Sequence, residues 1–251
     1  MFSRAFRKKN AAPPHPVSKT IDVAGRIMPL TIRQTQSATR LTLRIEPGGR
    51  ALKMTVPVGV PEREVDDFLD RHHGWLLTRL AKFPRAPLIA AGRYIHLRGI
   101  AHRIEHTGKL RGLTESVMIE DEAVIKVSGE EVHLKRRLRD YFREEARRDL
   151  TPLVERHAAV IGRKPGTLTL KDTRSRWGSC SHDGNLNFSW RIIMAPPIVI
   201  DYLAAHEVSH LAEMNHGPRF WSICEALCPQ TEEAKRWLKR NGSMLHAIDF
   251  T

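Results

Sequence analysis

Three histidines and a glutamate in the C-terminal third of the chain have the spacing of a metal site. His206 and His210 are four residues apart with Glu207 between them, and His216 follows six residues later. On a helix, residues i and i+4 share one face, so both imidazoles can bind one divalent cation while Glu207 holds an attacking water. Catalytic zinc usually takes three protein ligands and a water. The pattern therefore predicts one Zn²⁺ per chain, with two core histidines satisfied by hydrogen bonds as the structural alternative.

The third ligand is predicted from the residues after the helix. His216 is favoured, because the helix can stop near Met214-Asn215 and Asn tolerates the left-handed conformation that would turn the chain back to the metal. The spacing equals that of metzincins, H-E-x-x-H-x-x-G-x-x-H, except that Glu213 replaces the glycine, which weakens a metzincin assignment. A carboxylate from a following helix is the alternative ligand, and the candidates are Glu225, Glu232 and Glu233.

The elements around the metal pattern can be predicted from local sequence. Pro196-Pro197 opens a largely apolar segment that predicts a buried helix through Leu211. Residues 167–171 and 185–193 have strand composition and are predicted to be joined across the polar loop 175–184. The strand at 185–191 is expected to be a sheet edge on which an extended substrate could pair.

Upstream of this region the chain alternates between β-type and helical patterns. Short alternating apolar stretches at 21–58 and 92–128 predict strands, and apolar residues at helical spacing in 61–84 predict one amphipathic helix. The charged segment 130–160 carries an apolar stripe and predicts a long helix. Three parts are expected: a basic flexible N-terminus (1–18), a β-rich region with one helix (19–128), and a region with the metal site (129–251) that can be continuous with the preceding one.

Other residues could contribute to chemistry near the metal. Arg174 and Arg176 precede a strand, where a fixed guanidinium could stabilise an oxyanion or form a structural ion pair. Tyr202 lies one turn before His206 and could point at the site or serve as a core aromatic. The remaining candidates are expected to be surface or packing residues: His72, His73, His96, His102, His106, Cys224 and Cys228.

Composition limits the class of protein. The chain has 251 residues, 41% of them hydrophobic, and no apolar stretch approaches the length of a membrane span. The N-terminus has basic residues without a following apolar stretch, which argues against a secretory signal. Three cysteines, an odd number, argue against a disulfide framework. We therefore expect a globular cytoplasmic protein.

The positive charge is concentrated at the N-terminal end. The formal net charge is +13, and residues 1–60 contribute +9 of it, from 11 lysines and arginines against Asp22 and Glu46. This asymmetry allows weak, sequence-independent binding of nucleic acid through phosphate neutralisation. The alternative to an enzyme is accordingly a nucleic-acid-associated binding protein in which zinc is only structural.

Several longer strings carry a family resemblance. Ser175-Arg-Trp-Gly-Ser-Cys-Ser181, Asn187-Phe-Ser-Trp-Arg191 and Ala195-Pro-Pro precede the histidine pattern, and Phe220-Trp221 follows it. Together they resemble the YgjP-like metallopeptidase family, predicted bacterial metal-dependent hydrolases whose zincin core is similar to that of SprT-like proteins, some of which cleave proteins crosslinked to DNA.

This resemblance extends over about residues 25 to 240. It implies that His206, His210 and His216 bind zinc and that Glu207 is catalytic. It also implies an α+β fold, with a zincin-like metallopeptidase core whose active-site helix packs on a small β-sheet and with a β-rich N-terminal region. The implied function is a zinc peptidase acting on a peptide or protein; a SprT-like protease acting on DNA-bound proteins is a variant of it.

Overall fold

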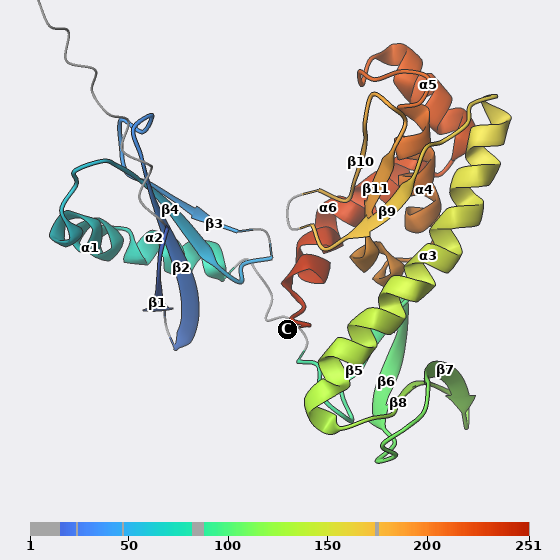
Figure 1. Cartoon of the computed structure of the whole chain (residues 1–251), viewed down its shortest axis with the longest axis horizontal. Helices are drawn as coiled ribbons and strands as arrows, with labels where there is room; N and C mark the ends of the chain where they lie inside the picture. The colour runs from blue at the N-terminus through green and yellow to red at the C-terminus, as the bar shows by residue number, and fades with distance from the viewer. Residues whose placement is uncertain (1–15, 24, 47, 82–87, 174–175, 251) are drawn as a thin grey trace, which may run out of the picture. The chain divides into compact units, whose positions relative to one another are not determined.

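The chain forms two compact units, residues 1–83 and 84–251 (Figure 1). The computed structural model describes residues 16–23, 25–46, 48–81, 88–173 and 176–250. Both units mix helices with small sheets, as the α+β prediction requires. None of the helices in these ranges is both long and apolar enough to cross a membrane.

The first unit is a four-stranded sheet with helices on one face. Alternation along the last strand buries Leu52, Met54 and Val56 and turns Lys53 and Thr55 to the other face. The buried face packs against apolar residues of two helices. The sheet has the order β1-β2-β4-β3, with β1 at Val17–Val23, β2 at Arg26–Thr35, β3 at Thr42–Ile45 and β4 at Leu52–Pro57.

The helical segment of this unit differs from the prediction of one helix. It forms α1 (Glu62–Arg71) and α2 (His73–Leu80), separated at His72, whose φ of −99° and ψ of 5° are not helical. The imidazole Nδ1 of His72 lies 2.8 Å from the carbonyl oxygen of Phe68 and its ring stacks on that of Phe68. The carbonyl oxygen of Phe68 also accepts the backbone N–H of His72. The imidazole and the backbone therefore share one acceptor at the point where the helix is interrupted.

The second unit is organised along one long helix, α3 (Leu134–Val160), which follows a short 3₁₀ turn, η1 (Glu131–His133) (Figure 1). One end of α3 packs on a four-stranded sheet of order β5-β6-β8-β7, and its other half packs on α4 and β9. The strands predicted between 92 and 128 are β5 (Tyr94–Leu97), β6 (Ile100–His106), β7 (Thr114–Ile119) and β8 (Glu122–Val127).

The two compact units divide at 83/84, whereas the sequence predicted regions of 19–128 and 129–251 and left their continuity open. Ile104 on β6 and Ile125 on β8 belong to one hydrophobic core with Leu138 and Phe142 on α3. Residues 94–127 therefore cannot be separated from the helix that follows them. Of the N-terminus expected to be flexible (1–18), Val17 and Ser18 belong to β1, and residues 1–15 lie outside the described residues.

The β5–β6 turn fixes the chain just before the helix that carries the predicted metal ligands His206 and His210. Arg98 and Gly99 both have positive φ, 52° and 79°, as two-residue hairpin turns require. Their backbone N–H groups donate to the carbonyls of Ile193 and Met194. The Arg98 side chain forms charge-assisted hydrogen bonds with two carboxylates of α3, so this turn ties sheet, α3 and the 190–194 segment together.

A second, three-stranded sheet departs from the prediction in three ways. Its order is β10-β11-β9, with β9 at Leu168–Lys171, β10 at Gly178–Cys180 and β11 at Leu186–Ser189. The polar loop 175–184 thus contains a strand, and 190–194 form a 3₁₀ helix, η2 (Trp190–Met194). Because β11 is paired on both sides, the expectation that 185–191 is a sheet edge is wrong.

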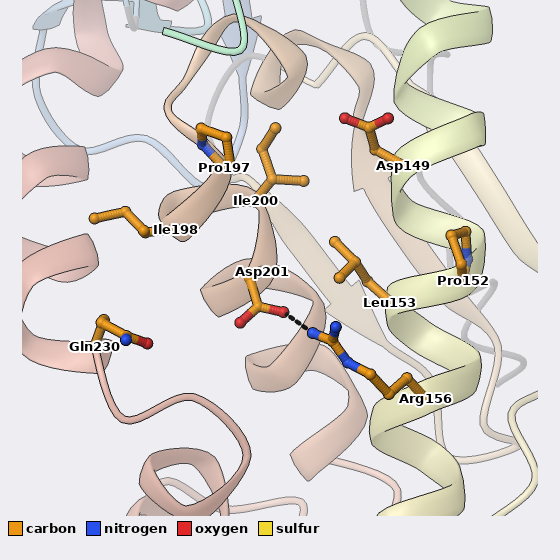
Figure 2. Close-up of a pocket in the computed structure, with 9 residues that line it drawn as sticks. All are labelled: Asp149, Pro152, Leu153, Arg156, Pro197, Ile198, Ile200, Asp201 and Gln230. Carbon is orange, nitrogen blue, oxygen red and sulfur yellow. Dashed lines mark hydrogen bonds and ion pairs between the residues drawn. The ribbon is translucent and has the colours of Figure 1, made fainter.

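Helix α4 (Pro197–Ser209) is tied to α3 through Asp201, whose ion pair with Arg156 is drawn in Figure 2. The carboxylate of Asp201 lies 2.6 Å from Arg156 and 2.9 Å from Nε2 of His157, both on α3. A cavity of about 560 Å³ lies between the two helices here, lined by Leu153 of α3 and Ile198 of α4 among others. The network sets the register of α4, which carries the candidate ligands in its last turn.

Candidate metal centre

Helix α4 brings the predicted ligands together at its C-terminal end. His206 and Glu207 lie in its last turn, and His210 is its C-cap residue. One ligand atom from each of His206, His210 and His216 lies within 4.8 Å of the other two. Nε2 of His206 is 3.1 Å from Nε2 of His216. Within the described ranges, this is the one group of three histidine, cysteine or acidic side chains positioned to hold a metal ion.

The return of the chain to His216 is made differently from the prediction. Helix α4 ends at Ser209 instead of continuing through Leu211, and the N–H groups of Leu211 and Ala212 then close tight turns on Val208 and Ser209. Asn215 does not have positive φ, so the expected left-handed residue is absent at that position. Successive turns after His210 replace a single left-handed cap and place His216 beside His206.

Hydrogen bonds at the outer ring nitrogens orient two of the imidazoles. Nδ1 of His210 lies 3.2 Å from the carbonyl oxygen of Glu213, to which it can only donate. Nδ1 of His206 lies 3.3 Å from the hydroxyl of Tyr202. Because Nδ1 is engaged in each ring, Nε2 is left for a metal ion, the arrangement usual for histidine ligands. Tyr202 is buried and lies edge-on to His206, a position that favours its core role over that of an oxyanion donor.

Burial favours the neutral form of two of the imidazoles, those of His206 and His210. Burial, reinforced by the charges of His210 and His216, lowers the pKa of His206 to about 4, and burial also lowers the pKa of His210. Neutral imidazole is the form that binds metals.

Phe220 supports all three rings from α5 (Pro218–Leu227). Its ring centroid is 4.9 Å from that of His206, 4.6 Å from that of His210 and 4.6 Å from that of His216, and the side chain is fully buried. Sequence reasoning gave Phe220 no individual role. The sequence signal that could have indicated this role is the position of Phe220, four residues after His216 and at the start of a helix.

Glu207 is buried next to the histidines in sequence, and one of its carboxyl oxygens is unpaired among the described residues. Its side chain is 3% exposed, and Oε2 has no hydrogen-bond partner within the described ranges. Burial raises the pKa of Glu207 to about 8, while the positive charge of Arg176 acts in the opposite direction. An unpaired buried carboxyl oxygen is costly, and it is satisfied by a proton donor or a cation in the space beside it. The three imidazoles and this oxygen therefore fit a metal ion with a water molecule.

A glycine on β10 makes room for Glu207. An added Cβ at Gly178 would overlap Oε1 of Glu207 and lie 2.6 Å from its Cδ. The preceding residue, Trp177, is fixed by stacking on His246 with ring centroids 4.1 Å apart, and by close approach to Gly242. Both of these partners lie on α6 (Thr231–Ala247). The absence of a side chain at Gly178 therefore allows the Glu207 carboxylate to lie against β10.

We expect Gly178→Ala to displace the Glu207 carboxylate and to lower peptide hydrolysis about 100-fold, since misplacing a reacting group by about 1 Å has effects of this size. Metal content should not change, because Gly178 does not contact the histidines. Steady-state hydrolysis and bound-metal analysis of the purified variant check both points. Gly74→Ala is the matched control, because a Cβ there meets nothing within 4 Å. Full activity in Gly178→Ala would contradict the fitted arrangement.

The other predicted site residues lie elsewhere or are only near the site. Arg174 falls outside the described residues, and Arg176 is exposed, with its charge acting on Glu207. The alternative ligands Glu225, Glu232 and Glu233 are not part of the histidine group. His102 is hydrogen-bonded within its own sheet, consistent with a packing role. All three cysteines are free, including the buried pair that was expected to pack, Cys224 and Cys228.

Comparisons with known proteins identify the family of the chain. The YgjP-like metallopeptidase domain matches residues 39–241, which is most of the chain. Among solved structures, the crystal structure of the metallopeptidase zymogen of Pyrococcus abyssi abylysin aligns at 18% identity and a TM-score of 0.34, over 36% of this chain and 93% of that one. No curated protein matches. On the extent of the domain match, the chain belongs to the YgjP-like family of metallopeptidases.

Proposed function

We propose that this chain is a zinc-dependent peptidase in which His206, His210 and His216 hold the metal and Glu207 is the general base and acid. The observation that carries the proposal is the buried, unpartnered Oε2 of Glu207 beside three convergent imidazoles. Three imidazole ligands with one open position are typical of catalytic zinc, whereas structural zinc sites have four protein ligands. This ligand count favours an enzyme over a binding protein with structural zinc.

The protein's own groups provide the proton transfer. When bound, zinc would act as a Lewis acid on the scissile carbonyl and lower the pKa of the attacking water. Oε2 of Glu207 accepts the proton of that water and then delivers it to the leaving amine. Burial keeps bulk water from competing for this oxygen, and Gly178 fixes its position. Tyr202 and the Glu213 carbonyl orient the imidazoles that hold the metal.

Strand β10 is the proposed docking edge for an extended substrate, in place of β11. It pairs with β11 on one side only, and it lies along α4 with Gly178 against Glu207. An extended peptide could add to its open edge through main-chain hydrogen bonds, which bind without regard to side-chain identity. A scissile bond held there would lie beside the catalytic carboxylate.

We also propose that the protein works in a reducing cellular compartment. The support for this is that its three cysteines are free.

A broad peptide library tests the proposal. Full-length protein loaded with Zn²⁺ is incubated with the library, and new peptide ends are identified by mass spectrometry. We expect cleavage that is lost when the metal is removed by a chelator and that returns when Zn²⁺ is restored. Cleavage that persists in metal-free protein would contradict the proposed role of the histidine group.

A further inference from the structure

The first unit carries a cleft on the sheet face opposite its helices. Cross-strand register places Arg33, Thr55 and Thr42 in one row, and Lys53 and Arg44 in the next. Their chain neighbours point into the core, so these side chains occupy the uncovered face. The cleft has a volume of about 480 Å³.

Cations and hydroxyls line this cleft without any carboxylate. The four cations are Arg33, Arg40, Arg44 and Lys53, and the other side chains are threonines, a serine and one alanine. Within the described ranges, the charged side chain of none of these four residues has a hydrogen bond or ion pair, whereas Lys19 on the opposite face pairs with Asp66. A bound anion would relieve the repulsion among these unpaired positive charges. If the anion carries oxygens, as a phosphate does, the surrounding hydroxyls can donate hydrogen bonds to them.

A smaller aromatic pocket adjoins the cleft around the β3 edge. It has a volume of about 300 Å³ and shares Arg40 and Thr42 with the cleft. Its aromatic wall consists of Phe68 and His72, whose rings stack at 4.0 Å, and of Trp75, which is 40% exposed. A flat indole held open to solvent beside a row of cations is a suitable platform for a nucleic-acid base.

We propose that the first unit binds single-stranded nucleic acid, with phosphates in the basic cleft and a base on Trp75. A backbone-tracking basic groove that continues into exposed aromatic rings is the combination by which proteins bind single strands without sequence preference. A duplex would use the cations alone, because its bases are stacked on each other and cannot reach Trp75. The +9 charge of residues 1–60 agrees with a polyanionic partner. This proposal is independent of the metal site, and its test needs no peptidase activity.

The phosphate contacts are tested by salt dependence. Fluorescence anisotropy of the full chain with an oligothymidine of about 15 nucleotides, over about 50 to 200 mM salt, gives the slope of log K against log salt. Each lost phosphate contact reduces that slope by about 0.7 for a single strand, so Arg33→Gln/Arg44→Gln should reduce it by about 1.4. Arg63→Gln/Arg79→Gln has the same net charge, with both changes on α1 and α2, and should keep the wild-type slope.

The base contact is tested separately at Trp75. Trp75→Ala should weaken oligothymidine binding about 5- to 150-fold, the usual range for one base–aromatic stack, with an unchanged salt slope. The same variant should bind an abasic oligomer of equal charge as well as wild type does, and Trp75→Phe should keep most of the affinity. A thermal melt of each variant checks that the fold is intact.

Three results would overturn the proposal: no oligothymidine binding at low salt, equal slopes for the cleft variant and its charge-matched control, or duplex binding as tight as single-strand binding with no effect of Trp75→Ala. The last result would assign the cleft to duplex phosphates instead. Residues 1–15 are the same in every variant, so their charges do not affect these comparisons.

Discussion

Glu207→Gln should keep its metal and its melting temperature and should lose peptide hydrolysis by a factor of about 100 to 10,000, the usual contribution of a positioned general base. The side chain of Glu207 is 3% exposed and packed against Gly178. Because glutamine has the same size, we expect the surrounding structure to be unchanged. The substitution removes the basic oxygen that has no hydrogen-bond partner among the residues that the structure describes. Hydrolysis rates, metal content and thermal melting are measured on the same preparation.

Glu225→Gln is the matched control for this experiment. It is the same chemical change at an exposed position of α5 outside the histidine group, and it should leave all three measurements at the wild-type level. Unchanged hydrolysis by metal-replete Glu207→Gln would exclude Glu207 as the base. Loss of metal from this variant would instead indicate that the carboxylate is a ligand.

The part of the site that lies within one helix was predictable from sequence. His206, Glu207 and His210 are related by helical periodicity alone, and the buried apolar segment from Pro197 onward correctly predicts the helix that carries them. His216 was predicted from its spacing, although the route by which the chain reaches the site was predicted wrongly. The turns after His210 are made by backbone hydrogen bonds. The residue types in this segment do not show which of these bonds form, so the turns could not be predicted from sequence.

Long-range relations could not be predicted from local patterns. Gly178 and Glu207 are far apart in sequence, and β10 is only three residues long, too short to show alternation. The segment 190–194, apolar except for Arg191, suits a strand or a helix equally, and it forms a 3₁₀ helix that is buried along its whole length. The continuity of 19–128 with 129–251 stayed open for the same reason, since strand patterns do not reveal that β6 and β8 share their core with α3.

The first unit illustrates what charge patterning can and cannot predict. The +9 charge of residues 1–60 is compatible with a polyanionic partner or with a solvated basic surface, and it gives no location for a binding site. Only the pairing of β2 with β4 and of β4 with β3 gathers Arg33, Lys53 and Arg44 on one face. The aromatic pocket at the β3 edge then distinguishes a single-strand site from a general basic surface.

His216→Ala should lose bound zinc as severely as His210→Ala does, and we expect the affinity for Zn²⁺ to fall at least about 100-fold, beyond the effect of removing an outer hydrogen bond to a ligand. His216 is exposed and follows the end of α4, so its removal leaves the core intact and the loss reports on the metal. Zinc content after dialysis, and competition with a chromophoric chelator, give the affinity.

Glu225→Ala tests the rival ligand and should retain full zinc, because Glu225 lies outside the group formed by the three histidines. The melting temperature adds a second readout. Since a ligand that binds only the native state stabilises it, Zn²⁺ should raise the melting temperature of Glu225→Ala as it does for wild type, and should have little effect on His216→Ala. If His216→Ala kept its zinc and Glu225→Ala lost it, the site would hold two histidines and a glutamate. The loop after His210 would then have no role in metal binding.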